Sequence, residues 1–272
     1  MTNSAQESPA TGMPRRGPVW LAGLRAIVAL MLREMSTRYG RSPGGYIWAI
    51  VEPLGALLVM AFAFSLLLRA PSLGNSFLLY YASGYLPFLV YAQVQAAVQT
   101  ALRFSRPLLM YPAVSWIDAI LARFFLNVLT SVLVMGIVFA AMIEVTGATA
   151  VLSYGPMIWA TCLSAVLGLA LGTLNAVLVG LYPAWGNIWS IASRPLFLIA
   201  GVIFIYEDLP RTVQDYLWYL PWIHITGLFR TGVYPTYEPQ YISLTLVMVW
   251  VLVPLALGLV LMRRFRQDIL TR

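Results

Sequence analysis

The residues able to carry chemistry in this 272-residue sequence leave little room for a catalytic or metal site. All 17 basic residues are arginine, so the lysine that a P-loop places on the β- and γ-phosphates of ATP is missing. The lone Cys162 and the lone His224 lack the co-ligands of a cysteine or histidine metal site. We therefore expect no cofactor and no metal in this chain, and if ATP drives the protein, a partner binds the ATP and its Mg²⁺.

Two ionisable residues lie inside or beside apolar runs, where charge is costly and often functional. Glu52 and Arg123 are both close to the end of such a run, so snorkelling or a structural ion pair explains them equally well. Near Arg123, Asn127 and Thr130 extend a polar face inward. That face favours a position along a transport pathway.

A stripe of aromatic and amide side chains at helical spacing is a further candidate. Its members are Tyr81, Tyr85, Phe88, Ala92, Gln95 and Gln99. Aromatic faces and amides suit sugar rings, which offer C–H faces and many hydroxyls. The alternative is a helix face that packs on its neighbours, with the tyrosines in the aromatic belt at the membrane interface.

The elements that position these residues belong to a very apolar chain. It is 60% hydrophobic and 10% charged, with a mean hydropathy of +0.80, whereas soluble domains are about 25% charged. The apolar residues gather in blocks of about 20, the length at which a helix crosses about 30 Å of hydrocarbon. We predict an all-α polytopic membrane protein whose six transmembrane helices form a permease domain over 46–272. The spans are 46–68, 77–97, 116–143, 154–181, 186–206 and 241–262.

Three segments lie outside these spans. Residues 1–17 are polar and are expected to form a disordered cytoplasmic tail. Residues 18–45 are predicted to form an interfacial amphipathic helix and a turn. A signal peptide is the alternative, but Arg25 interrupts the apolar stretch and no small-residue cleavage site follows. The Pro-rich region 207–240 is expected on the extracytoplasmic side, with short re-entrant or interfacial helices at 212–220 and 222–233.

Local signals refine the helices. Ser115-x-x-Asp118 and Thr212-x-x-Asp215 both match a capping box. Ser164, Gly168 and Gly172 form a row of small residues that permits close helix packing. A loop that contains Arg103 and Arg106 is expected after the second span.

The arginines predict the orientation. With both termini in the cytoplasm, 14 of the 17 arginines lie on or near the cytoplasmic side, and Arg69, Arg211 and Arg230 lie outside. This bias accounts for most of the net charge of +7 without any acidic ligand. We expect membrane lipids and no nucleic acid as partners.

Four segments in order carry a family resemblance: 38–53, RPLLMYPAVSWIDAILAR (106–123), RPLFLIAGVIFIYEDLP (194–210) and PWIHITGLFRTGVYP (221–235). The first contains Arg38-Tyr39-Gly40-Arg41-Ser42 and Glu52-Pro53. Together they resemble the membrane-spanning permease of type-2 ABC exporters, and within that group the capsule polysaccharide exporters, over about residues 25–272.

The resemblance implies a transport permease of the bacterial inner membrane and not an enzyme. It implies a homodimer with two copies of a separate ATPase, which exports a lipid-linked acidic polysaccharide. In Gram-negative members a periplasmic adaptor and an outer-membrane channel continue the path.

The resemblance also implies two groups of site residues. Those expected to couple to the ATPase are Arg33, Arg38, Arg103, Arg106, Tyr111 and Asp118. Those expected along the substrate pathway are Arg41, Tyr81, Tyr85, Gln95, Arg123, Asn127 and Arg194. The arginines near the entrance could attract the polymer or a lipid phosphate, although the positive-inside rule predicts arginines there anyway.

Three other functions remain open. The first is a related exporter of O-antigen or teichoic acid. The second is a membrane enzyme acting on lipid-linked sugars, for which Glu207, Asp208 and Asp215 form the candidate acid cluster. The third is an ion-coupled transporter, which would need a buried acid near the membrane centre. No predicted span holds one there.

Overall fold

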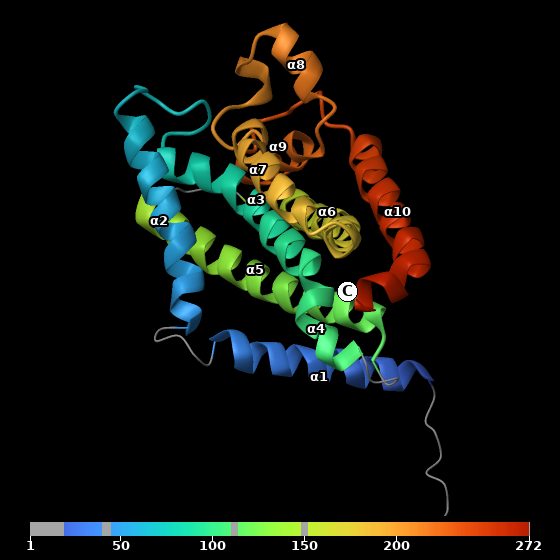
Figure 1. Ribbon diagram of the computed structural model, residues 1–272. Coiled ribbons are helices and arrows are strands. Elements are labelled where there is room, and N and C mark those ends of the chain that lie inside the picture. The colour runs from blue at the N-terminus through green and yellow to red at the C-terminus, as the bar shows by residue number, and fades with distance from the viewer. Residues whose placement is uncertain (1–18, 40–44, 110–113, 148–151, 272) are drawn as a thin grey trace, which may run out of the picture.

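The computed structural model describes residues 19–39, 45–109, 114–147 and 152–271, and the regular structure in these ranges is helical (Figure 1). Its elements are α1 (Val19–Tyr39), α2 (Gly45–Ser65), α3 (Phe77–Gln99), α4 (Ala101–Leu109), α5 (Trp116–Thr146), α6 (Tyr154–Leu181), α7 (Ala184–Ile199), the 3₁₀ turn η1 (Tyr206–Asp208), α8 (Arg211–Leu217), α9 (Pro221–Val233) and α10 (Leu244–Thr271). The predicted tail 1–17 lies outside the described residues.

Four of the described helices are long and apolar enough to cross a membrane, namely those that contain Ile47–Ser65, Trp116–Thr146, Tyr154–Leu181 and Leu244–Ile269. They are α2, α5, α6 and α10. The chain is therefore a multi-pass membrane protein. α3 is 23 residues long, but its tyrosines and glutamines make it more polar. α7 has only 16 residues, fewer than the roughly 20 that a straight crossing needs.

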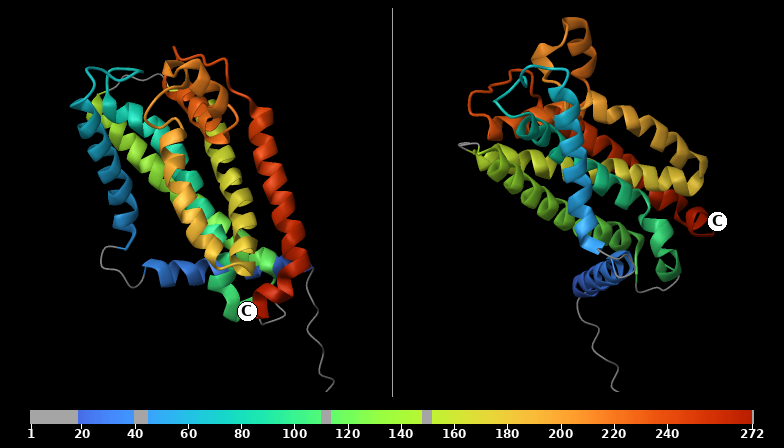
Figure 2. Two further views of the ribbon diagram at one scale, coloured as in Figure 1. Left: turned by 45° about the horizontal axis from the view of Figure 1, so that its top comes forward. Right: turned by 90° about the vertical axis from the view of Figure 1, so that its left-hand side faces the viewer.

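The long helices form one bundle with a distinct element at each end. α1 lies across one end of the bundle, and α8 lies at the opposite end (Figures 1 and 2). α6 is the most buried of the four apolar helices and packs between α3 and α10. The polar residues near α1 and those near α8 are therefore separated by the length of the bundle.

Close contact between α3 and α6 depends on glycine. A Cβ at Gly168 would lie 2.9 Å from the carbonyl oxygen of Tyr91, and a Cβ at Gly172 would lie 2.7 Å from Cβ of Val98. Real Cβ atoms do not approach so closely, so only glycine lets these backbones meet. The predicted close-packing role of this small-residue row is confirmed.

The two predicted capping boxes have different outcomes. At the start of α5, Asp118 N–H donates to Ser115 Oγ at 3.1 Å, and Ser115 N–H donates to Asp118 Oδ2 at 2.9 Å. That capping box is confirmed. The box predicted at Thr212 is wrong, because α8 begins at Arg211 and has no side-chain cap. Pro210, whose φ is already fixed near the helical value, precedes the helix instead.

Several predicted boundaries differ from the structure. The predicted helix 186–206 ends at Ile199, because Gly201 adopts a φ of +73° and turns the chain out of the helix. The loop expected around Arg103 contains the short helix α4. α10 continues to Thr271, beyond the predicted end at 262. The short helices expected at 212–220 and 222–233 are present as α8 and α9.

Candidate functional site

A cleft of about 580 Å³ opens among the first five helices. Its lining residues are Glu34 of α1, Glu52 of α2, Phe104 of α4, Arg123 of α5, Leu89, Ala92, Gln93, Ala96 and Ala97 of α3, and Thr100, which caps the end of α3. We call it the α1 cleft. Its floor is apolar alanine and leucine, and its charged groups come from three different helices.

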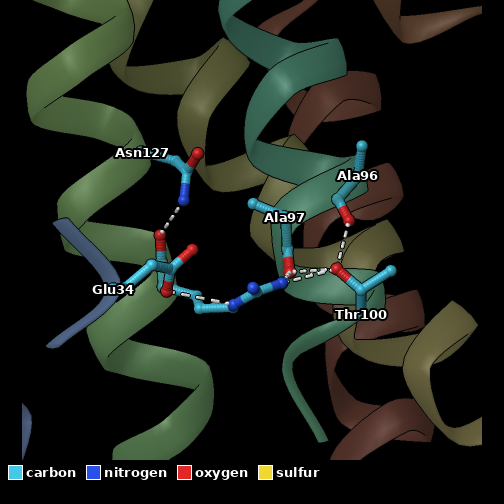
Figure 3. A network of polar contacts seen from close by, with 6 residues as sticks. Glu34, Ala96, Ala97, Thr100 and Asn127 are labelled. Atoms are coloured by element: carbon cyan, nitrogen blue, oxygen red, sulfur yellow. Dashed lines mark hydrogen bonds and ion pairs between the residues drawn. The ribbon is translucent and has the colours of Figure 1, made fainter. Parts of the chain in front are cut away.

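Arg123 organises the α1 cleft. Its Nε donates to Glu34 Oε2 at 3.1 Å, which ties α5 to the crosswise helix α1 (Figure 3). Its Nη1 donates to the carbonyl oxygen of Ala97 at 3.0 Å and to the hydroxyl of Thr100, both at the end of α3. The guanidinium also lies over the ring of Phe104, 4.2 Å from the centroid. One side chain thus joins α1, α3, α4 and α5.

The predicted polar face beyond Arg123 is present, and its two predicted members, Asn127 and Thr130, both donate to carbonyl oxygens of α5 itself. Asn127 Nδ2 donates to the carbonyl oxygen of Arg123 at 2.8 Å, within α5. One turn further, Ser131 Oγ donates to Gln93 Oε1 at 2.7 Å. Gln93 lines the cleft and was not among the predicted site residues. The predicted Gln95 is buried and donates from Nε2 to Gln99 Oε1 at 2.7 Å on another face of α3.

The charges of the α1 cleft do not form a basic funnel. Its lining holds two carboxylates, Glu34 and Glu52, and one guanidinium, Arg123. The Arg123 charge is compensated by Glu34 at 3.1 Å. Glu52 is exposed on a helix that is otherwise apolar. Any attraction for an anionic polymer must come from other arginines.

The predicted aromatic stripe on α3 packs mostly inside the protein. Tyr81 is fully buried, and its ring lies 5.2 Å from that of Phe64. The rings of Tyr85 and Phe88 pack edge to face on that of Phe197 of α7, with centroid distances of 5.9 and 5.8 Å. Ala92 alone of the stripe lines the cleft. The other predicted pathway residue with a described side chain, Arg194, is exposed on α7 and does not line the α1 cleft.

The predicted coupling residues divide into exposed arginines and a helix cap. Arg33, Arg103 and Arg106 are exposed on α1 and α4. Arg33 lies 5.8 Å from the Phe104 ring centroid, which shows that α1 and α4 are neighbours. Asp118 completes the capping box of α5. The side chains of Arg38, Arg41 and Tyr111 lie outside the described residues.

At the α8 end, tyrosines and one acid form a second polar cluster. The ring of Tyr206 stacks on that of Tyr241 at 4.1 Å, and the Tyr237 hydroxyl donates to Glu207 Oε2 at 3.0 Å. Burial raises the pKa of the Tyr237 phenol and raises that of Tyr241 to about 12. Glu207 thus has a structural partner. Within the described parts of the chain, no three His, Cys, Asp or Glu side chains gather as metal ligands do.

Arg230 of α9, one of the three arginines predicted on the extracytoplasmic side, is almost fully buried within the protein. Its Nη1 donates to the carbonyl oxygen of Phe204 at 2.9 Å, and its Nη2 donates to that of Val202 at 3.0 Å. The guanidinium lies over the Tyr80 ring, 4.6 Å from the centroid. A Cβ at Gly84 would lie 2.9 Å from Nη2, so glycine makes room for it. Arg230 therefore fastens α9 to the chain that follows α7.

Known proteins resemble this chain over nearly its full length. Polysialic acid transport protein KpsM of Escherichia coli is 29% identical over 251 residues, which cover 90% of this chain and 95% of the relative. Capsule polysaccharide export inner-membrane protein CtrC of Neisseria meningitidis serogroup A is 28% identical over 250 residues, which cover 90% of this chain and 92% of that relative. Capsule polysaccharide export inner-membrane protein BexB of Haemophilus influenzae is 28% identical over 248 residues, with the same coverage.

The match to a family is equally broad. The ABC-2 type transporter family matches residues 25–234, which include α2 to α9, most of α1 and every residue that lines the α1 cleft. This apolar helical chain belongs to the ABC-2 type transporter family of membrane proteins.

Proposed function

We propose that this chain is the transmembrane subunit of an ATP-driven exporter that moves lipid-linked capsular polysaccharide across the bacterial inner membrane. One observation carries the proposal: three relatives named for polysialic acid transport or capsule polysaccharide export match 90% of the chain. Those names favour capsular polymers over O-antigen or teichoic acid. In the enzyme alternative Glu207 would act as an acid or base, and its contact with Tyr237 leaves it poorly placed for that.

The α1 cleft supports a polar cargo. Glu52 is exposed beside Gln93 and Thr100 in a cleft between apolar helices. A carboxylate facing hydrocarbon costs several kcal/mol, whereas one facing a hydrated path does not. We place the cytoplasmic entrance of the polymer at this cleft. The attraction for an acidic polymer comes from Arg33, Arg103 and Arg106, because the lining itself is not basic. These arginines are exposed on α1 and α4, two helices that each contribute a residue to the lining.

The proposal includes the assembly and the orientation. The chain acts as a homodimer with two copies of a separate ATPase. The absence of lysine from its 272 residues, and so of the P-loop lysine, supports the separate ATPase. α3 and α7 complete six crossings, with both termini in the cytoplasm. α7 buries no residue within its own chain, which suits a helix that meets lipid or a second copy. α8 and α9 lie at the extracytoplasmic exit, where an adaptor and an outer-membrane channel continue the path.

The proposal is tested by deleting the gene and locating the polysaccharide. We expect polymer to accumulate in the cytoplasm and to vanish from the cell surface, with export restored by the wild-type gene. Purification in mild detergent should recover an ATPase with this chain. Normal surface polysaccharide in the deletion strain would refute the function. Export that persists after the ATPase gene is deleted would favour an ion-coupled transporter.

A further inference from the structure

A second cavity, of about 590 Å³, is lined by residues of η1, of α8 and of the turn that follows α8. α8 lies at the end of the bundle opposite α1 (Figures 1 and 2). Its lining residues are Tyr206, Thr212, Asp215, Tyr216, Trp218 and Tyr219. We call it the α8 pocket. Four of its six side chains are aromatic, and the other two are a hydroxyl and a carboxylate. Its volume lies within the roughly 300–1,000 Å³ typical of small-ligand sites.

Two of the aromatic rings are fixed in place without a ligand. Tyr206 stacks one face on Tyr241 at 4.1 Å, and its hydroxyl donates to the carbonyl oxygen of Gln214 at 3.2 Å. The indole N–H of Trp218 donates to the carbonyl oxygen of Tyr241 at 3.1 Å. Rings already held in position lose little conformational entropy when a ligand binds, so the α8 pocket is preorganised.

The polar groups of the α8 pocket are available for binding. The Asp215 carboxylate is exposed, and in the described part of the chain nothing donates a hydrogen bond to it. It lines the same pocket as the four aromatic rings. In keeping with this, burial and then the charges of Asp215 and Glu207 raise the pKa of the Tyr206 phenol. Tyr216 and Tyr219 are 76% and 64% exposed, so their ring faces are accessible.

We propose that the α8 pocket binds a neutral pyranose unit of a polysaccharide. The negative face of an aromatic ring attracts the polarised C–H groups on one face of a sugar ring. A carboxylate has two oxygens and accepts hydrogen bonds from two neighbouring hydroxyls. An acidic sugar is disfavoured, because its carboxylate would lie in the same pocket as that of Asp215.

The main competing occupant is a lipid headgroup, since tyrosine and tryptophan also form the belt at the membrane interface. Such a belt needs neither a carboxylate nor rings that enclose one cavity. A phospholipid phosphate would also be repelled by Asp215. The observations therefore favour a neutral sugar.

The role of the α8 pocket in transport rests on the proposed export function. A site at the exit end would hold a sugar unit during export and so oppose backward movement of the polymer. The polymer, or the linker that joins it to its lipid, then contains neutral sugar units.

Binding is tested on the full-length protein in lipid nanodiscs. The probes are hexasaccharides of glucose, galactose and N-acetylglucosamine, with a sialic acid hexamer as the acidic comparison, measured by saturation-transfer NMR and titration calorimetry. At least one neutral probe should bind with a Kd of about 1 mM, and the acidic hexamer at least about tenfold more weakly. Failure of all three neutral probes, or equal binding of the acidic one, would overturn the inference.

Variants locate the site. Asp215→Asn and Tyr216→Ala should each weaken binding about fivefold to tenfold. Tyr154→Ala is the matched control, because Tyr154 is a tyrosine of similar exposure, 67%, that does not line the α8 pocket. It lies at the start of α6 and close to α9, since the N–H of the preceding Ser153 donates to the carbonyl oxygen of Gly232 at 2.8 Å. Unchanged binding in both pocket variants would overturn the site. Crosslinking of a photoreactive phospholipid to Tyr216 in place of sugar binding would assign the aromatic rings to the membrane belt.

Export is measured separately. Cells that carry Asp215→Asn and Tyr216→Ala together should show less surface polysaccharide at a normal membrane level of the protein. Unchanged export would remove the role in export. Normal surface polysaccharide in the deletion strain would instead refute the proposed function, and sugar binding by the purified protein would still stand.

Discussion

At the residue scale, the Glu34–Arg123 pair is the clearest link between the crosswise helix and the bundle. Both side chains are nearly buried, with exposed fractions of 5% and 11%. Removing one member of a buried pair leaves an uncompensated charge, and this typically costs about 3–5 kcal/mol. The pair therefore holds α1 firmly against α5.

We predict that Glu34→Ala lowers the free energy of unfolding by about 3 kcal/mol. Thermal unfolding of the purified protein in detergent measures the change. Arg25→Ala, at an exposed arginine on the same helix, is the control and should be nearly neutral. Glu34→Ala combined with Arg123→Met should recover part of the loss, because no charge is then left unpaired. Equal stability of Glu34→Ala and Arg25→Ala would contradict this role.

A second residue-scale prediction concerns pH. Tyr237 and Tyr241 have pKa values raised above the ordinary value of about 10, so the folded state keeps phenol protons that the unfolded state loses. Stability is then complete below about pH 10 and falls as the pH rises above that value. Unfolding temperatures measured from pH 8 to 11 should show the decline, and Tyr237→Phe should show a shallower one. Parallel curves would mean that Tyr237 does not titrate with folding.

The sequence predicted the polar character of the site better than its contacts. Arg123 and Asn127 were expected on a polar face and are there, but Glu34 lies 89 residues from Arg123. Nothing local in a sequence pairs residues at that separation. The sequence pattern placed Gln95 on the pathway, whereas Gln93 lines the cleft. The two residues differ by about 200° of rotation around the helix and so lie on different faces. The face that lines a cleft depends on neighbouring helices, which the pattern of one helix does not specify.

At the element scale, α3 and α6 form the most extensive contact between two described helices. We predict that Gly172→Ala destabilises the protein by about 1–3 kcal/mol, because its Cβ would lie 2.7 Å from Cβ of Val98. Gly136→Ala is the matched control, since a Cβ there meets nothing within 4 Å. That change should be neutral, or stabilising by up to about 1 kcal/mol through helix propensity. Similar unfolding temperatures for the two variants would show that α3 and α6 can move apart at Gly172 without loss of stability.

α4 supplies the second prediction at this scale. Charge reversal at Arg106, which is exposed on α4, should lower ATPase stimulation and export while the unfolding temperature stays unchanged. Charge reversal at Asp118 should lower export and stability together, because it breaks the capping box of α5 at a cost of about 1 kcal/mol. Normal ATPase stimulation and export in the Arg106 variant would remove α4 from the coupling surface.

Long apolar helices were predictable because their length and hydropathy are local properties. α6 coincides with the expected 154–181, and α2, α3 and α5 begin within about one residue of their predictions. The missed features depend on context. α4 is short and mixes arginines with buried Ala101 and Leu102, so its sequence alone resembles a polar loop. The early end of α7 follows from Gly201, which has a left-handed φ and lies so near α9 that a Cβ there would be 3.1 Å from Thr226 Oγ1.

At the scale of the whole molecule, the proposed orientation can be read from cysteine labelling. Cys162 is the only cysteine in the sequence, so Cys162→Ala provides a cysteine-free background. In intact spheroplasts, a membrane-impermeant maleimide should label Tyr216→Cys and should spare Arg103→Cys until the membrane is opened. Both positions are exposed, so access alone decides the result. The reverse pattern would place the termini outside.

The buried Arg230 also bears on how the protein is made. Its guanidinium is held by the carbonyl groups of Val202 and Phe204, which lie before α9 in the chain. Until that bend after α7 has formed, the charge has no partners of this kind and favours water over hydrocarbon. The acceptor carbonyl groups are therefore synthesised before the donor Arg230. α9 is expected to dock only after the segment that precedes it has folded. The docking of α9 therefore depends on the bend after α7, and the end of the molecule that contains α8 and α9 assembles around Arg230 only once that bend exists.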